Sequence, residues 1–105
     1  DVALPDDMCV SITDTEAENG YPISGFTWIL VYRDQKYGNR TIEQAQALKD
    51  LMLWCVTTAQ AHSAELLYAP LPKAATEKAL KLVERISFGD DPVKPASMPA
   101  KKSTE

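Results

Sequence analysis

Few residues that could do chemistry stand together in this chain of 105 residues. His62 is the single histidine, and its neighbours Ser63 and Glu65 lie in the same helical pattern. Asp50 lies too far along that helix to orient the imidazole, so a Ser-His-Asp triad would need partners from another part of the chain. We therefore interpret His62 as a partly exposed residue on a helix surface.

The other side chains with ligating or nucleophilic atoms lack the spacing of a metal site. Asp14, Glu16 and Glu18 lie in one acidic loop, but a calcium loop requires a stricter spacing of its ligands. Cys9 and Cys55 have no metal-like spacing, and we interpret Cys55 as a small buried hydrophobe. A disulfide between the two cysteines stays open for an oxidising compartment.

Four further side chains could touch a ligand. Ser24 and Thr27 carry hydroxyls near the start of an apolar run, where such groups more often satisfy turn or hinge backbone atoms. Trp28 and Trp54 could stack on a ligand, but both fit the apolar patterns of a core. The sequence has no Gly-rich phosphate loop and no metal-ligand cluster. We therefore predict no enzyme, no cofactor and no catalytic, ligand-binding or metal-binding residue in this chain.

The composition is that of a soluble globular domain or a fragment of one. Hydrophobic residues make up 45% and charged residues 25% of the chain, which are ordinary values. The net charge of −4 and the scattered basic residues argue against binding of nucleic acid. No apolar run reaches the roughly 18 residues of a membrane span. Since the sequence starts with Asp rather than Met, we expect that processing or truncation has removed a preceding segment.

Two segments of the first third have strand patterns. Residues 8–12, "MCVSI", alternate apolar with smaller side chains and predict a short strand. Residues 26–32, "FTWILVY", are apolar at nearly every position, which is typical of a strand covered on both faces by helices. Burial of each large side chain there would stabilise the fold by roughly 1.5–3 kcal/mol. We expect this second strand to be central in its sheet.

Two helices should follow. Thr41 is a good N-cap, and Gln44 stands at the position that a capping box requires. The apolar stripe continues to about Tyr68, with a bend expected along this length, and the prolines in 69–72 then end the helix. The second apolar stripe predicts a helix that Gly89 ends. The residues from Asp90 onward are rich in Pro, Ser and Lys, and we expect them to be disordered or loosely draped.

The order of these patterns resembles a known family. The stretches "YPISGFTWILVY", "LKDLMLWCVTTAQ" and "LLYAPLP" resemble the C-terminal part of the PstS-type phosphate-binding receptors, and the resemblance extends over residues 4–86. It implies an α/β fold that is part of a two-lobed periplasmic binding protein, whose lobes close on the ligand about a hinge. Residues 1–24 would end the second lobe and cross the hinge, 25–88 would complete the first lobe, and 89–105 would be a disordered tail.

The resemblance also implies a function. Such receptors capture inorganic phosphate in the periplasm and deliver it to the permease of an ABC transporter. In the family, hydroxyls, helix N-termini, an Asp and an Arg from earlier parts of the chain hold the phosphate. Arg33, Arg40 and Arg85 do not stand at the position of the family's phosphate arginine. The resemblance therefore implies a structural segment, which meets phosphate and permease only through the rest of a receptor.

A second interpretation stays open, in which the chain is a free-standing α/β interaction or oligomerisation module that has lost phosphate binding. Both interpretations predict an apolar surface that needs a partner, because a lone sheet leaves unpaired edges. We expect the isolated chain to self-associate. The receptor assignment depends on residues 26–32 being enclosed, and an exposed position would count against it.

Overall fold

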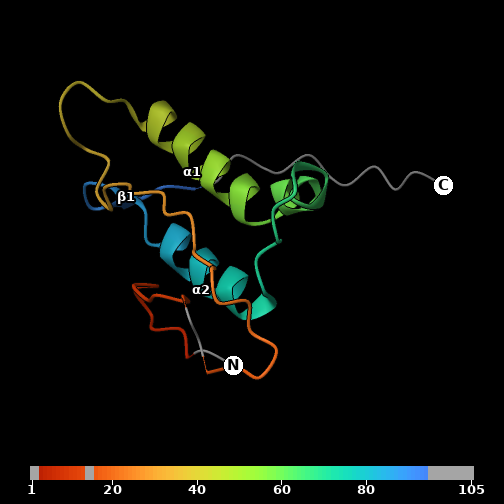
Figure 1. Ribbon diagram of the computed structural model, residues 1–105. Coiled ribbons are helices and arrows are strands. Elements are labelled where there is room, and N and C mark those ends of the chain that lie inside the picture. The colour runs from red at the N-terminus through yellow and green to blue at the C-terminus, as the bar shows by residue number, and fades with distance from the viewer. Residues whose placement is uncertain (1–2, 14–15, 95–105) are drawn as a thin grey trace.

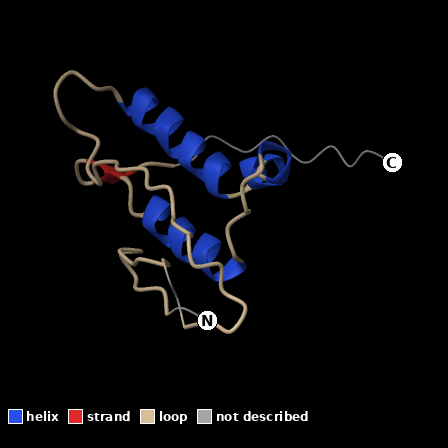
Figure 2. Cartoon of the chain, in the orientation of Figure 1, coloured by secondary structure: helices blue, strands red, loops and turns tan. Residues whose placement is uncertain are grey.

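The computed structural model describes residues 3–13 and 16–94 (Figure 1). Two helices dominate this part of the chain, and two short 3₁₀ turns and a small hairpin connect and follow them (Figure 2). The elements in chain order are α1 (Ile42–Val56), η1 (Thr58–His62), η2 (Ala64–Leu66), α2 (Lys73–Glu84), β1 (Ser87–Phe88) and β2 (Asp91–Pro92). The strands β1 and β2 are antiparallel neighbours. The fold is thus a small mixture of helix and strand.

The start of α1 confirms the predicted capping box. The Thr41 hydroxyl accepts a hydrogen bond from the Gln44 amide at 3.3 Å, and the Gln44 side-chain oxygen accepts one from the Thr41 amide at 3.0 Å. These reciprocal bonds satisfy two amides that an α-helix leaves open at its N-terminus.

The first helix is shorter than predicted, because α1 ends at Val56 and only 3₁₀ turns follow it. Side chains occupy two carbonyls that later amides of a longer helix would use. The Thr57 hydroxyl donates to Leu53 O at 2.6 Å, and the side-chain nitrogen of Gln60 donates to Cys55 O at 2.8 Å. This competition gives a physical reason for the break, and it places the expected bend at Thr57.

The second helix is confirmed, with Pro72 at its N-cap, but Gly89 does not end it. The helix closes at Arg85, whose amide bonds back to Leu82 O. Gly89 instead has φ 63° in the two-residue loop between β1 and β2, a conformation that glycine adopts without strain.

The prediction of disorder from Gly89 onward is wrong for residues 89–94. They form the hairpin loop, β2 and a segment whose Val93 side chain is 2% exposed. The rest of the predicted tail, residues 95–105, lies outside the described residues.

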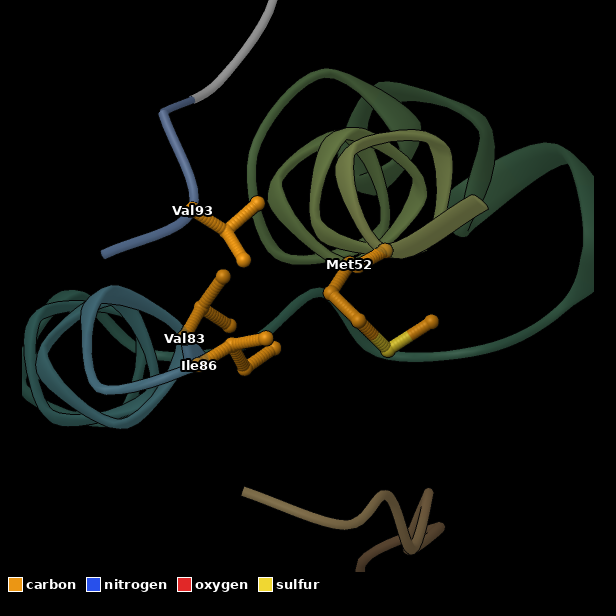
Figure 3. Close-up of a cluster of buried hydrophobic side chains, with 5 residues drawn as sticks. Met52, Val83, Ile86 and Val93 are labelled. Carbon is orange, nitrogen blue, oxygen red and sulfur yellow. The ribbon is translucent and has the colours of Figure 1, made fainter. Parts of the chain in front are cut away.

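The core lies between the two helices and the segment that follows β2. Figure 1 shows α2 running back alongside α1, and Figure 3 shows side chains from both helices and from Val93 pointing into one space. The buried members of this cluster are Ala45, Met52, Val83, Ile86 and Val93. Leu48, Leu53 and Phe88 pack against it. The core is small, because it draws on only a few residues of each segment.

Lys49 is buried beside this core and is only 5% exposed. Its ammonium group donates to Glu84 O at 3.1 Å and to Val93 O at 2.7 Å. Glu84 is the last residue of α2, where carbonyls lack partners within the helix and a positive charge is favourable. One side chain of α1 therefore holds both the end of α2 and the segment after β2.

The two predicted strands do not form. Residues 26–32 run as an extended loop, and Leu30 is 94% exposed. A strand needs a neighbour for its backbone groups, and the described part of the chain offers none along this segment. The prediction of a buried strand under two helices is therefore wrong for this chain. Residues 8–12 also form a loop, in which Met8 has φ 61° and is buried.

The N-terminal segment is held to α2 through Lys78. Its ammonium group donates to Leu4 O and lies 3.3 Å from a carboxylate oxygen of Asp6. Since Asp6 is exposed, we expect this ion pair to contribute little to stability.

We predict that Lys49→Met lowers the free energy of unfolding by about 1–3 kcal/mol, because it leaves one buried and one part-buried carbonyl without this donor while keeping the apolar stem. Urea denaturation followed by circular dichroism measures the change. Lys73→Met serves as the control, since Lys73 makes only an exposed pair with Glu77 at 3.8 Å and its loss should change stability by less than about 0.5 kcal/mol. Equal effects of the two substitutions would contradict the role assigned to Lys49.

Candidate functional site

The structure gathers no catalytic group around His62. This residue lies exposed at the end of η1. Within residues 3–13 and 16–94, no hydrogen bond joins its imidazole to Ser63, Glu65 or Asp50. The arrangement therefore offers no triad.

The hydroxyl of Ser24 satisfies a turn, as its position in the sequence indicated. It donates to Tyr21 O at 2.8 Å, while the Thr13 hydroxyl donates to Ser24 O at 3.0 Å. The prediction that Trp28 and Trp54 lie in the core is wrong, because both side chains are about half exposed. Trp28 belongs to the extended loop, and Trp54 lies two residues from the buried Met52, on a different face of α1.

The two cysteines are not joined in this structure: Cys9 is exposed and Cys55 is half-buried. Asp14 lies outside the described residues, and Glu16 and Glu18 are exposed. Among the residues with described positions, no group of His, Cys, Asp or Glu side chains could hold a metal ion.

The densest polar arrangement joins residues 33–36 to the β1–β2 hairpin, and we call it the Asp34 joint. The Gln35 amide donates to Ser87 O at 2.8 Å, and the Ser87 amide donates to Arg33 O at 2.9 Å. These two bonds make a parallel bridge between Asp34 and Ser87. The joint ties the end of the extended loop to the hairpin, and through the hairpin to the core.

The carboxylate of Asp34 reinforces this joint. One of its oxygens accepts the Lys36 amide at 2.9 Å and the Gly89 amide at 2.8 Å. The hydrogen bond from the Lys36 amide, and then that from the Gly89 amide, lower the pKa of Asp34 below its ordinary value, because both favour the charged form. The charged carboxylate therefore fixes the hairpin loop against the chain before α1.

A shallow depression of about 300 Å³ adjoins the joint and is lined by Tyr32, Asp34, Lys36 and Tyr37. The two tyrosine rings meet edge to face with centroids 5.0 Å apart, and the Arg40 guanidinium lies 5.2 Å from the centre of the Tyr37 ring. A phosphate site needs several converging N–H donors or cations. Here a carboxylate forms part of the wall, and its charge would repel an anion.

Two buried polar atoms belong to residues that are close in sequence to those lining the depression. Neither atom has a hydrogen-bond partner among the described residues. They are the side-chain oxygen of Gln35 and Nε of Arg40. The Gln35 side chain is fully buried, and its nitrogen donates to Tyr32 O. Both groups lie between the exposed loop and α1. The hydrogen-bonding capacity of this stretch is therefore not fully used within the described residues.

Our reading of the sequence missed Asp34 and Lys49. Asp34 stands in a charged turn and gives no sequence signal, because its partner Gly89 lies 55 residues away. Lys49 did give a signal: it follows Ala45 by one helical turn and precedes Met52 by three residues, so it lies on the apolar stripe. A lysine on such a stripe indicates a buried or snorkelling cation.

Comparison with known proteins gives one partial similarity. The chain is 36% identical over 47 residues to the phosphate-binding protein PstS of Methanocaldococcus jannaschii. The similar stretch covers 45% of this chain and 12% of that relative, so the chain spans a small part of the relative's length. No family model and no solved structure matches the chain. In residues 3–13 and 16–94, no helix has the length and apolar character needed to cross a membrane.

We predict that Asp34→Asn destabilises the fold at pH 7 and that this difference shrinks on acidification. Because the pKa of Asp34 is lowered by folding, its contribution is fully present above the ordinary pKa of 3.8 and is lost as the pH falls through the lower value in the folded chain. Urea midpoints at pH 7 and below pH 3.8 measure the difference. Asp90→Asn is the matched control, since it removes the same kind of charge from the hairpin loop that the Asp34 carboxylate holds. A difference that stays constant with pH would contradict this assignment.

Proposed function

We propose that this chain is a segment of a PstS-type receptor, which captures inorganic phosphate in the periplasm for uptake by an ABC transporter. The observation that carries the proposal is the 36% identity over 47 residues to a phosphate-binding protein. In this proposal residues 1–24 end the second lobe and cross the hinge, and residues 25–88 complete the first lobe. Phosphate and the permease are partners of the whole receptor.

Within that receptor we assign the segment a structural role. The Asp34 joint and its depression present a carboxylate, exposed tyrosines and one lysine, which is a poor set for phosphate. Neither His62 nor Ser24 has a geometry that suits an anion. The phosphate-binding groups are therefore expected in parts of the receptor outside this sequence.

The exposure of residues 26–32 removes one argument for the receptor. The sequence led us to expect this segment inside a sheet, and its exposed position counts against that inference for the isolated chain. The proposal therefore rests on the partial similarity. An apolar segment whose backbone amides have no acceptor in residues 3–13 and 16–94 is nevertheless what a sheet would leave if its neighbouring strands belonged to another part of a longer protein.

The alternative function is a free-standing interaction module that has lost phosphate binding. The observation that favours it is the same apolar segment, because large exposed apolar surfaces mark contacts with other proteins. The two functions differ in what covers the segment: neighbouring strands of one polypeptide, or a separate protein.

A chimera tests the receptor proposal. It replaces the C-terminal part of the Methanocaldococcus jannaschii protein with residues 4–86 of this chain, the range of the resemblance. We predict that the chimera folds and binds phosphate within about tenfold of the parent affinity, measured by isothermal titration. Sulfate serves as the control anion. A chimera that does not fold, or that folds without binding phosphate, would contradict the receptor assignment.

The structural role is tested separately by titrating phosphate into the isolated 105-residue chain. We predict no detectable heat of binding, because the Asp34 carboxylate in the wall of the depression would repel a phosphate ion. Saturable binding of phosphate would contradict the claim that no residue of this segment contacts the phosphate.

A further inference from the structure

Residues 26–32, which we call the 26–32 segment, offer an unused edge of backbone. No backbone amide of this segment donates a hydrogen bond within the described part of the chain. The side chains of residues 27–32 are exposed as well, with Leu30 at 94% and Ile29 at 59%, whereas Phe26 is half-buried. The segment has no regular secondary structure, and it leads directly into the Asp34 joint, where the chain is held to β1. It is therefore a stretch of backbone with unpaired amides that is anchored at one end.

The segment lacks the features that protect natural strand edges from pairing. Such edges carry lysines, prolines or bulges, and the 26–32 segment has no charged residue and no proline. The chain as a whole has a net charge of −4, but the nearest charges on the C-terminal side are Arg33 and Asp34. Close approach of two such segments is therefore not opposed by like charges within them.

We propose that two copies of this chain associate by antiparallel pairing of their 26–32 segments about a two-fold axis at Ile29. In this register Phe26 faces Tyr32 of the second copy, Trp28 faces Leu30, and Ile29 faces itself. Each pair joins side chains on the same face of the ribbon, which is the condition for cross-strand stabilisation. A two-fold interface needs a patch that is complementary to itself, and this sequence provides one.

The Asp34 joint indicates which edge is free. The backbone groups of Arg33 and Gln35 face β1, and in a regular strand every second residue faces the same side. The backbone groups of Trp28 and Leu30 then face away from β1. Trp28 of one copy and Leu30 of the other exchange hydrogen bonds across the axis. Ile29 becomes the pair without hydrogen bonds, whose side chains lie closest together.

The exposed area suits a weak dimer. Counted at roughly 150 Å² for a fully exposed side chain, the large residues of the segment expose on the order of 500 Å² per chain. Tyr21 and Ile23, also exposed, raise this to on the order of 700 Å². Stable interfaces bury about 800 Å² per partner, so we expect association that depends on concentration in the micromolar range. This inference does not rest on the receptor proposal, since it concerns the chain by itself.

Sedimentation velocity of the full chain tests the proposal. We expect the mass to rise from 11.6 kDa toward twice that value with concentration. Ile29→Lys places two like charges face to face on the axis and should leave a monomer with unchanged helical circular dichroism, because Ile29 lies outside the core. Leu66→Lys is the matched control: Leu66 is 67% exposed but lies in η2, and the variant should dimerise like the original chain. A strict monomer, or equal loss of association in both variants, would overturn the proposal.

Mixing two variants tests the register. Ile29→Lys and Ile29→Glu should each be monomeric, and an equal mixture should form a heterodimer, because position 29 meets itself only in this pairing. A mixture that stays monomeric would rule out the two-fold axis at Ile29. Neither result affects the phosphate affinity of the chimera, so failure of this inference and failure of the receptor proposal are distinguishable.

Discussion

The ammonium group of Lys49 lies buried between α1, the last turn of α2 and the segment after β2, and it donates to a carbonyl of each of the latter two. A buried charge without hydrogen bonds would cost far more than the small core could offset. The helices and the hairpin segment must therefore keep their relative positions for the charge to stay satisfied. The Asp34 joint extends this constraint to the chain before α1, because it fixes the hairpin loop against residues 33–36. The described fold is a helix pair closed by a hairpin, with polar contacts at both ends.

This arrangement leaves the first third of the chain with little to pack against. The core cluster takes its members from both helices, Ile86 and Val93, and none of them from the described residues 9–13 and 16–32. Small chains bury a limited share of their apolar surface, so a segment as apolar as "FTWILVY" exceeds what this core encloses. Coverage from outside the described fold, by neighbouring strands of a receptor or by a second copy, satisfies the same backbone groups and removes the same side chains from water.

Local features of this fold were predictable from the sequence, and long-range features were not. The capping box at Thr41 and the apolar stripe of α2 depend on residues close in sequence, and both are confirmed. The 26–32 segment has a strand pattern, but a strand forms only with a neighbour that the pattern cannot supply. The hairpin was not predicted because its strands are only two residues long. The Asp34 joint was not predicted because Asp34 and Gly89 lie far apart in the sequence. The burial that the sequence pattern assigned to Trp28 and Trp54 is wrong, because both side chains are about half exposed.

We infer that the 26–32 segment is exposed in this chain because its neighbouring strands are missing, and that it is paired within a larger body. Amide hydrogen exchange of residues 26–32 tests it most directly, measured on the dilute isolated chain and on the same residues within the chimeric receptor. We predict rapid exchange in the dilute chain and strong protection in the receptor. Rapid exchange in a folded receptor, or strong protection in the dilute monomer, would contradict it.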